Sequence, residues 1–272
     1  MFKSYGINKK SEATSAIDLA MEEFHHLGYT IIEDVLNEEE LKKLRDELHR
    51  VYDFQEKEFG RDKLQQIHEL HIARALLCYS EAYLDLARNA VMMEYVKKAL
   101  GNYFILHLQN GIINMPNEEH HQSSWHRDLP YQNWTSSEPI GCNVFYCLDD
   151  FSDETGGTIL LPVSHKIDHA PSENFMKEHG VQVNAKAGSV LFFDSMLFHK
   201  AGYNRSKDQV RRGINHLYAR AIVRQQIDIP QMMNGKYADD PFLNILLGYD
   251  AQAPAGVQEF RERRFKKNQK SY

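Results

Sequence analysis

The sequence predicts a mainly β fold, a barrel or jelly roll, supported by helices from the N-terminal part of the chain. Two observations carry this prediction. Apolar residues recur at helical spacing up to about residue 102, and from residue 103 at least five short apolar runs alternate with Gly, Pro, Asp and Asn turns. The 272 residues contain no Gly- or Ser-rich linker and no internal repeat, so we expect a single domain over 1–272.

The helical part begins with clear end signals. The stretch SAIDLAMEEFHHLG repeats apolar residues at helical spacing and is followed by Gly28, which is typical of a helix C-terminus. A short strand is expected over 29–36. Asn37, with Glu40 three residues later, forms a variant of the capping box and predicts that a long amphipathic helix follows.

A second helical block is expected from about residue 62 to Gly101, which closes it. Five strand-like runs then follow, and a C-terminal stretch ends in a charged helix at about 257–267. The expected parts of the domain are a helical part over about 1–102, a β core over about 103–222 and an extension over about 223–272. The strand-like runs are YFILHLQNGIINMP, PIGCNVFYCLDD, GGTILLPVS, GSVLFFDS and RRGINHLYARAIV.

Composition and charge exclude several classes of protein. Hydrophobic residues make up 42% and charged residues 26%, which is typical of a globular protein. The net charge of −6 argues against a nucleic-acid partner, which usually requires a basic excess. The N-terminus is polar, and no apolar run approaches the ~20 residues that cross a bilayer, so we expect no membrane partner. Three cysteines without metal-type spacing indicate reduced thiols and a cytoplasmic location.

The stretch SSWHRDLPYQ places an imidazole and a carboxylate two residues apart. On an extended segment, His126 and Asp128 would project to the same side, where both can bind one metal ion. Two ligands are too few for a tight site, and two histidines with one carboxylate are typical of non-heme Fe(II) oxygenases. The best third ligand is His199, which follows the apolar run GSVLFFDS at a point where the strand breaks.

Other histidines are weaker candidates for the third ligand. His165 lies in a turn, where a structural hydrogen bond is the expected role, and His216 shares a strand face with Arg212 instead of Arg211. His120 and His121 belong to the polar segment 117–124, which we expect to be solvated; the alternative is a substrate lid.

A site of this type requires a co-substrate that supplies electrons. If that molecule is 2-oxoglutarate, its distal carboxylate needs a permanently charged partner, for which arginine suits better than lysine. Arg211 opens the strand-like run after His199 and shares one face with Gly213 and Asn215. The glycine on that face is expected to leave room for a ligand.

The segments WHRD, ETGGTILLPVSHK and LFFDSMLFHKAG followed by RRGINHLY resemble the phytanoyl-CoA dioxygenase family of Fe(II)/2-oxoglutarate oxygenases. The segment FHHLGYTIIEDVLNEEELKKLRDEL is similar to the N-terminal helix–strand–helix of that family. The resemblance covers most of residues 20–222 and implies a double-stranded β-helix fold. It also implies that His126, Asp128 and His199 bind iron, that Arg211 binds the co-substrate and that Asn114 lines the co-substrate site.

The activity implied by this resemblance is dioxygenation. Fe(II), 2-oxoglutarate and O2 would support hydroxylation of a C–H bond, with succinate and CO2 as products. Ala201 stands where several relatives carry a serine that helps to bind 2-oxoglutarate, so that contact must come from elsewhere. In halogenases of the family a small residue replaces the carboxylate, so the presence of Asp128 argues for oxygen transfer.

The substrate is expected to be a small polar metabolite or a natural-product intermediate. Three aromatic residues near the metal motif are candidates for contacting it or for core packing: Trp125, Tyr131 and Trp134. Two alternatives remain, a metal-binding β-helix module without turnover and an oxygenase of a carrier-bound or macromolecular substrate. The sequence carries no signal of oligomeric state.

Overall fold

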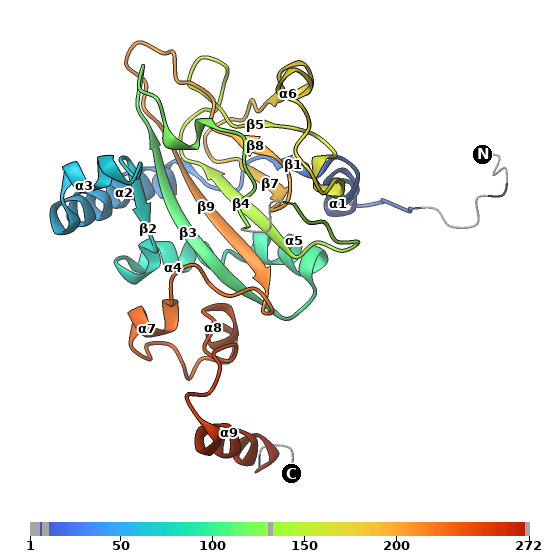
Figure 1. Cartoon of the computed structure of the whole chain (residues 1–272), viewed down its shortest axis with the longest axis vertical. Helices are drawn as coiled ribbons and strands as arrows, with labels where there is room; N and C mark the ends of the chain where they lie inside the picture. The colour runs from blue at the N-terminus through green and yellow to red at the C-terminus, as the bar shows by residue number, and fades with distance from the viewer. Residues whose placement is uncertain (1–5, 7–10, 130–132, 270–272) are drawn as a thin grey trace.

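The structure, a computed structural model, describes residues 6, 11–129 and 133–269. Two antiparallel sheets lie at its centre, and most of the helices come before residue 104 or after residue 220 in the chain (Figure 1). The larger sheet contains β1 (Tyr29–Ile32), β2 (Ile72–Arg74), β3 (Phe104–Asn114), β4 (Gly141–Cys147), β7 (Val190–Asp194) and β9 (Arg211–Arg220). The smaller sheet contains β5 (Ile159–Leu160), β6 (Val181–Gln182) and β8 (His199–Lys200).

Nine α-helices occur in the described residues. Five precede β3, with β1 and β2 lying among them in the chain, one lies between β5 and β6 of the small sheet, and three form the C-terminal part. They are α1 (Ala16–Leu27), α2 (Glu38–Phe59), α3 (Arg61–Gln66), α4 (Glu81–Ala87), α5 (Ala90–Leu100), α6 (Glu173–His179), α7 (Ile229–Met233), α8 (Pro241–Leu246) and α9 (Val257–Gln269).

The end signals expected at Gly28, Asn37 and Gly101 are present. Gly28 adopts the left-handed conformation, with φ of 91°, directly after α1. The Asn37 side chain accepts from the backbone of Glu40, whose carboxylate accepts from the backbone of Asn37, so the capping box is complete. Gly101 follows the last residue of α5. These signals are local, and so they act wherever the segment finally packs.

The helical block expected from residue 62 to Gly101 is interrupted, which corrects that prediction. Three residues between α3 and α4 adopt the left-handed conformation, with φ of 56° at His68, 65° at His71 and 47° at Ala75. An α-helix does not continue through such residues. Between His71 and Ala75, β2 pairs with β3 and forms an edge of the large sheet. Hydrogen bonds to a distant strand therefore replace those of a local helix.

The large sheet has the strand order β1-β7-β4-β9-β3-β2. The strand expected over 29–36 is shorter, because β1 ends at Ile32, and β1 and β2 form the two edges of this sheet. At one end of the long β3–β9 pair, Asn114 lies opposite Arg211. This register brings the amide and the guanidinium that the sequence singled out to neighbouring positions.

The two faces of the large sheet carry different contacts. On one face, Val144, Tyr146 and Ile214 share a hydrophobic core with residues of α1, α2, α4 and α5. On the other face, Phe145 packs in a second cluster that includes Leu160 of the small sheet. Because side chains alternate along a strand, helices cover one face and the small sheet covers part of the other. Polar side chains from both sheets, among them Asn215 and His199, line a cavity in the space between them.

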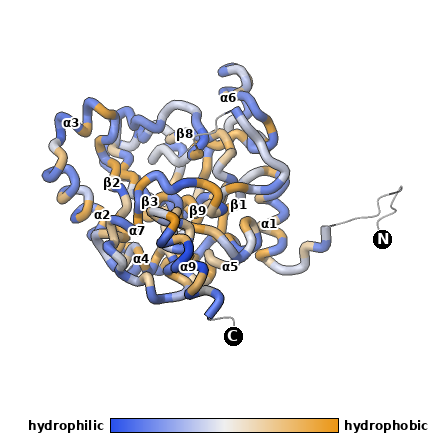
Figure 2. Tube along the Cα trace, turned by 60° about the horizontal axis from the view of Figure 1, so that its bottom comes forward, coloured by the Kyte–Doolittle hydropathy of each residue, from blue (hydrophilic) through white to orange (hydrophobic). Residues whose placement is uncertain are grey.

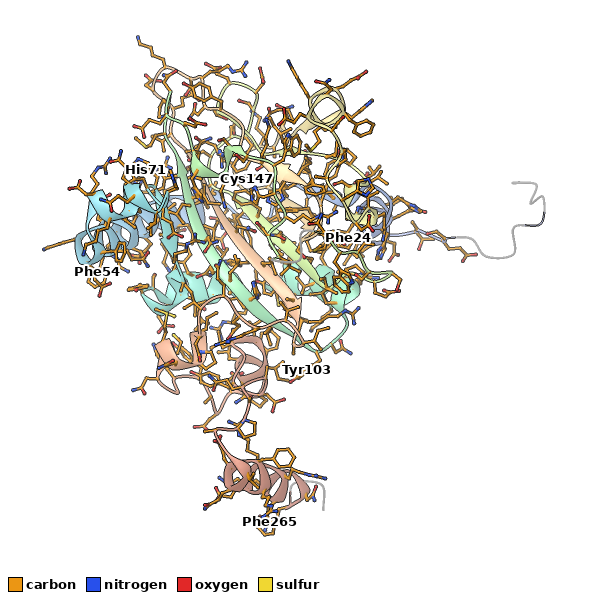
Figure 3. The ribbon with its side chains drawn as sticks, viewed as in Figure 1. Phe24, Phe54, His71, Tyr103, Cys147 and Phe265 are labelled. Atoms are coloured by element: carbon orange, nitrogen blue, oxygen red, sulfur yellow. The ribbon has the colours of Figure 1, made fainter. Side chains whose placement is uncertain are left out.

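The C-terminal helices α7, α8 and α9 extend below the sheets in Figure 1, with α9 farthest away. Figure 2 shows apolar segments gathered on the strands and inner helices, whereas α9 is mainly hydrophilic. Figure 3 places Phe265 on α9, and its side chain is exposed. Among the described helices, none combines the length and the hydrophobicity required to cross a membrane.

Asp194, at the end of β7, allows a stability prediction. Burial raises the pKa of this carboxyl from 3.8 to about 6, and Lys166 and Arg127 offset the effect only in part. The folded state thus holds its proton more tightly than the unfolded state. The free energy of unfolding therefore falls as the pH rises from about 4 to 6. Above pH 6 the ionised Asp194 lowers it by a constant amount of about 3 kcal/mol.

Asp194→Asn is therefore expected to increase the free energy of unfolding at pH 7.5 by up to about 3 kcal/mol. The replacement amide oxygen can still accept the Met196 N–H, which the carboxylate accepts at 2.8 Å. Urea unfolding of both proteins between pH 4 and 7.5 would test this. A difference that fails to shrink as pH falls toward 4 would contradict the titration of Asp194 as its cause.

Candidate metal centre

His126 and His199 face each other across a backbone pairing. Each N–H donates to the carbonyl oxygen of the other residue at 3.0 Å, which adds His126 to the edge of the small sheet. The Nδ1 atom of His126 lies 2.8 Å from the Ser124 carbonyl, and that of His199 lies 3.0 Å from the Leu197 carbonyl. With Nδ1 bonded in this way, Nε2 is the nitrogen that each ring can offer to a metal.

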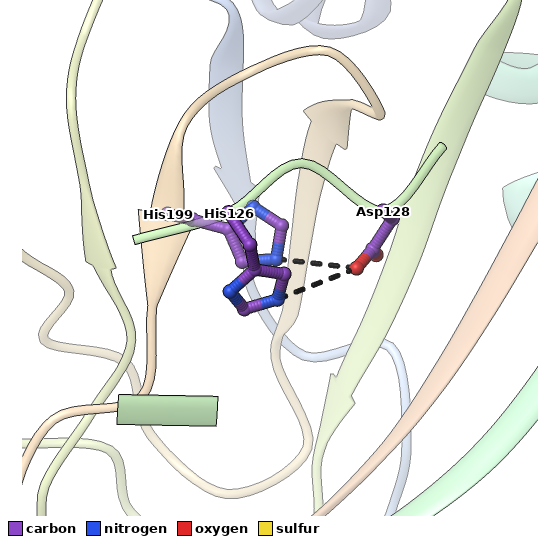
Figure 4. A group of neighbouring side chains, drawn as sticks. All are labelled: His126, Asp128 and His199. Carbon is purple, nitrogen blue, oxygen red and sulfur yellow. Dashed lines mark ion pairs between the residues drawn. The ribbon is translucent and has the colours of Figure 1, made fainter. Parts of the chain in front are cut away.

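Asp128 completes a group of three. Its Oδ1 atom lies 3.6 Å from Nε2 of His126 and 3.5 Å from Nε2 of His199 (Figure 4). One donor atom from each residue lies within 4.8 Å of the other two. A metal with bonds of about 2.1 Å at right angles separates its ligands by about 3 Å, so a small inward shift would suffice for binding.

The second carboxylate oxygen of Asp128 is held by the large sheet. Asn143 on β4 donates to Oδ2 at 2.5 Å, and Asn215 on β9 donates to the same atom at 3.1 Å. The two amides also bond to each other at 2.9 Å. Oδ1 is consequently left for the imidazoles or a metal, and the group joins both sheets.

The protonation of the three side chains favours metal binding. Burial raises the pKa of Asp128, but His199, His126 and Asn215 together lower it well below its usual range. Burial, followed by the nearby His199, lowers the pKa of His126, so this ring is neutral. Burial lowers the pKa of His199, yet Asp128 reverses the effect and raises it overall. A cation would therefore displace a proton from His199 and find the other two ligands ready.

The nitrogen that His126 offers has no other use. Its Nε2 is buried and has no hydrogen-bond partner. The side chains of His126, Asp128 and His199 expose only 27%, 10% and 8% of their surface. A buried polar atom without a partner costs roughly 1–3 kcal/mol, so an absent partner is implied. Two imidazoles and one carboxylate suit a divalent iron.

Arg211 lies in the same small cavity as the three residues. It is 1% exposed, its Nη2 donates to the Gly156 carbonyl at 2.8 Å, and its Nε has no partner. Burial lowers its pKa to about 10, so it stays charged at neutral pH. No carboxylate among the described residues forms an ion pair with it, although its guanidinium stacks over Phe151 at 4.6 Å. A buried cation of this kind calls for an anionic ligand.

Arg212, the neighbouring arginine, is used differently. Its Nε and Nη2 atoms donate to the Asp149 carboxylate at 2.7 and 2.9 Å, and its backbone N–H donates to the same carboxylate at 2.8 Å. This bidentate pair satisfies the charge of Arg212 within the chain. The two consecutive arginines therefore differ in whether an internal carboxylate neutralises them.

The face shared by Arg211, Gly213 and Asn215 points into the space between the sheets, as the alternation predicted. The expected role of Gly213 was wrong, however. A Cβ atom at this position would lie 2.4 Å from the Phe145 ring, so the absent side chain leaves room for that ring instead of a ligand. Asn114 lies beside this face, with its Nδ2 donating to the Gly202 carbonyl at 3.0 Å and its Oδ1 buried without a partner.

The other histidines have separate environments. His165 is buried next to Gly28, and His216 is buried between Gln109 and Tyr218, at 2.8 and 3.1 Å. Both therefore have structural roles. The expectation of a solvated His120 was wrong, because its side chain is 7% exposed, and burial lowers its pKa to about 2. Neighbouring segments cover it in a way that the polar local sequence does not reveal.

The two aromatic candidates that the structure describes, Trp125 and Trp134, do not line the metal cavity. Trp125 packs against Leu161, Met176 and Phe198, with Lys200 over its ring at 5.3 Å. Trp134 is 46% exposed. Tyr131 lies outside the described residues. Sequence alternation explains the position of Trp125, since the residue before His126 on an extended segment points to the opposite side.

Three residues at the site were not predicted from the sequence. Asn143 supports Asp128, and Thr158 and Gln122 line the metal cavity with Arg211. A signal existed for Asn143, because it is a polar residue within the apolar strand run GCNVFYC, and buried polar groups in strands need partners. Thr158 and Gln122 lie in segments whose approach to Arg211 depends on distant pairing.

Two histidines and a carboxylate brought together between two antiparallel sheets are typical of non-heme iron oxygenases. The family comparison agrees with this class. The model of the Phytanoyl-CoA dioxygenase (PhyH) family matches residues 24–213, and the chain belongs to this family. It is a 2-oxoglutarate-dependent non-heme iron dioxygenase, and its cofactors are iron, 2-oxoglutarate and O2.

Relatives and solved structures extend the comparison. The chain is 32% identical over 226 residues to uncharacterized protein Rv1501 of Mycobacterium tuberculosis, covering 80% of this chain and 81% of that protein. It is 23% identical over 219 residues to the ectoine dioxygenase of Nocardia farcinica, covering 66% and 70%. HygX from Streptomyces hygroscopicus, solved with nickel and 2-oxoglutarate, shares the fold with a TM-score of 0.62 at 16% identity, covering 80% and 92%.

Proposed function

We propose that the protein hydroxylates an unactivated C–H bond of a small polar metabolite or natural-product intermediate, releasing succinate and CO2. His126, Asp128 and His199 would hold the Fe(II). The strongest support is the close approach of two imidazoles and one largely buried carboxylate. The Nε2 atom of His126 in this group has no hydrogen-bond partner. When bound, iron supplies the redox chemistry that couples O2 to decarboxylation of 2-oxoglutarate.

Arg211 is proposed to bind the distal carboxylate of 2-oxoglutarate. Its support is the charged guanidinium, which is buried beside the metal group without an internal carboxylate. Thr158, in the same cavity, can supply the hydroxyl contact that Ala201 does not. Asn114, opposite Arg211 in the β3–β9 pair, is proposed to line the co-substrate site.

We interpret the two sheets as the halves of a double-stranded β-helix within one domain over 1–272. Asp128 supports this interpretation, because it joins the small sheet, through His126 and His199, to two asparagines of the large sheet. Trp125 and Trp134 remain proposed substrate contacts, supported for Trp125 by Lys200, which lines the metal cavity too.

Release of succinate is the direct test of the function. Purified protein with Fe(II), 2-oxoglutarate and O2 is expected to release succinate faster when a metabolite from a broad panel is the substrate, and mass spectrometry should show a product heavier by one oxygen atom. Failure of every metabolite to stimulate succinate release would favour the non-catalytic metal-binding alternative. Stimulation only by carrier-bound or macromolecular substrates would favour the other alternative.

Asn143 provides a prediction about support of the metal group. Asn143→Ala is expected to weaken Fe(II) binding by about 10- to 100-fold, because the variant loses one of two amides that fix Asp128. Asn184→Ala, at an exposed position, is the matched control. Titration with Fe(II) under anaerobic conditions gives both affinities. Equal affinities in the two variants would show that the amide does not position the carboxylate.

A further inference from the structure

A cavity of about 540 Å³ lies beside the metal group. The turn between α3 and β2 forms one side of it, and segment 117–124 forms the other. Figure 3 labels His71, which belongs to this turn and lies near the edge of the large sheet. The volume falls within the range of roughly 300–1,000 Å³ that is usual for small-molecule sites. We call it the histidine cavity, after its lining residues His68, His71, His120 and His121.

Unpartnered polar atoms gather in the histidine cavity. Nε2 of His71, Nε2 of His120 and Oδ1 of Asn114 are all buried without a hydrogen-bond partner. Glu118 lies near His71, with 3.2 Å between Oε2 and Nε2, but the geometry is not that of a hydrogen bond. Because native proteins rarely leave such atoms unsatisfied, their concentration around one hollow indicates a polar ligand.

The lining of the cavity also limits the charge of that ligand. Two acidic side chains, Glu118 and Glu119, accompany the imidazoles, and no lysine or arginine lines the cavity in the described part of the chain. Of the nearby cations, Arg74 is paired with Glu69, and Arg211 lines the metal cavity, where its charge is assigned to the co-substrate. His120 is neutral, since burial lowers its pKa to about 2. A phosphate or carboxylate would find no counter-charge in such a lining.

The histidine cavity adjoins the metal group. Asn114, in its wall, is the register partner of Arg211. Ser124, also in its wall, accepts the Nδ1 hydrogen bond of His126. The single turn His121–Ser123 separates the two hollows, because His121 lines the histidine cavity while Gln122 lines the metal cavity. A ligand in the histidine cavity would thus lie next to the reacting group.

We propose that the histidine cavity recognises the primary substrate, and that this substrate carries hydroxyl or ammonium groups but no phosphate or carboxylate. The inference rests on the proposed function. The Nδ1 atom of His120 accepts from the Gln122 N–H at 3.2 Å, so the neutral ring carries its hydrogen on Nε2, which can donate to a hydroxyl oxygen. Oδ1 of Asn114 and the two glutamates can accept from hydroxyl and ammonium groups. The unpartnered Nε2 of His120 is therefore a donor to the ligand, and Glu118 is the lining carboxylate that would pair with an ammonium group.

Binding to the protein loaded with Fe(II) and 2-oxoglutarate under anaerobic conditions tests the proposal without turnover. The probes are two matched series, glucose, glucosamine and glucose 6-phosphate, and glycerol, 3-amino-1,2-propanediol and glycerol 3-phosphate. Isothermal titration calorimetry is expected to show binding of the amine and the alcohol in at least one series, at least tenfold tighter than binding of the phosphate. Equal or tighter binding of both phosphates, or no binding of any probe, would overturn the assignment.

Two variants locate the binding. His120→Phe keeps a ring but removes the Nε2 donor to the hydroxyl groups that both the amine and the alcohol carry, so binding of both should weaken at least tenfold. The change also removes the acceptor of the Gln122 N–H, so a small fall in melting temperature is expected, and retained release of succinate without substrate would show that the site remains folded. His26→Phe, on the exposed face of α1, is the control and should bind normally. Glu118→Gln should weaken binding of the amine more than that of the alcohol. Normal binding by both His120→Phe and Glu118→Gln would place the probe elsewhere and overturn the proposal.

Failure of this inference is distinguishable from failure of the proposed function. Slow release of succinate from 2-oxoglutarate without any substrate reports on the iron and Arg211 alone. If the unmodified protein shows that release but no probe binds, the substrate assignment fails and the dioxygenase function stands. If the probes bind but Asp128→Ala retains full release, the proposed metal site fails and the binding cavity stands.

Discussion

Asp128→Ala is expected to abolish both iron binding and turnover. The change removes the carboxylate that faces Nε2 of His126 and Nε2 of His199, and it leaves two imidazoles as the remaining ligands. Two ligands do not hold Fe(II) firmly, and the amides of Asn143 and Asn215 lose their acceptor. The loss should exceed the roughly 10- to 100-fold that removal of a supporting residue costs. Iron content after dialysis and coupled release of succinate measure the two effects.

His126→Ala should give the same result, because it removes the ligand whose Nε2 has no other partner. Asp168→Ala is the matched control, since this carboxylate is exposed and pairs only with His169 among the described ion pairs. Circular dichroism should show that all three variants remain folded. Normal iron content with normal coupled turnover in Asp128→Ala and His126→Ala would refute the assignment of the metal site.

Arg211→Ala is expected to raise the KM for 2-oxoglutarate by at least about 30-fold. Loss of one partner from a buried charge pair costs roughly 2–5 kcal/mol, and each 1.4 kcal/mol is a factor of ten. The guanidinium is 1% exposed and lacks an internal carboxylate, so its charge is available to the co-substrate. Initial rates of succinate release at varied 2-oxoglutarate concentrations give the KM.

The neighbouring arginine supplies the control. Arg212→Ala breaks the bidentate pair with Asp149, so it should lower the melting temperature while changing the KM far less. The comparison separates the role of position 211 from a general loss of positive charge. A larger KM increase in Arg212→Ala than in Arg211→Ala would show that the co-substrate binds to the other arginine.

The parts of the fold that could be predicted are those with local causes. The ends of α1 and α2 follow from Gly28 and from the capping box at Asn37, whose atoms lie within a few residues of one another. The strand β2 could not be predicted in this way. It forms because Ile72–Arg74 pairs with β3, a strand that begins about 30 residues later, and because left-handed residues on both sides exclude a helix.

The same division applies to the site. Alternation along an extended segment places His126 and Asp128 on one side, and it separates Arg211 from Arg212. The contact of Asp128 with Asn143 and Asn215 joins segments 15 and 87 residues apart, so no local pattern reveals it. His120 was predicted wrongly for the same reason. Its segment is polar, so exposure to solvent was expected, but distant parts of the chain cover its side chain.

The reciprocal backbone bonds between His126 and His199 have a consequence for handling the enzyme. Backbone pairing already fixes the two histidines at adjacent positions, so we expect the chain to fold without iron. A zinc finger, in contrast, folds only when its metal is bound. A chelator should strip the ion and leave a folded protein, which takes up a spectroscopic substitute such as cobalt without refolding. The protein can thus be stored without iron, which prevents its oxidation by O2 at the bound metal, and loaded with iron immediately before use.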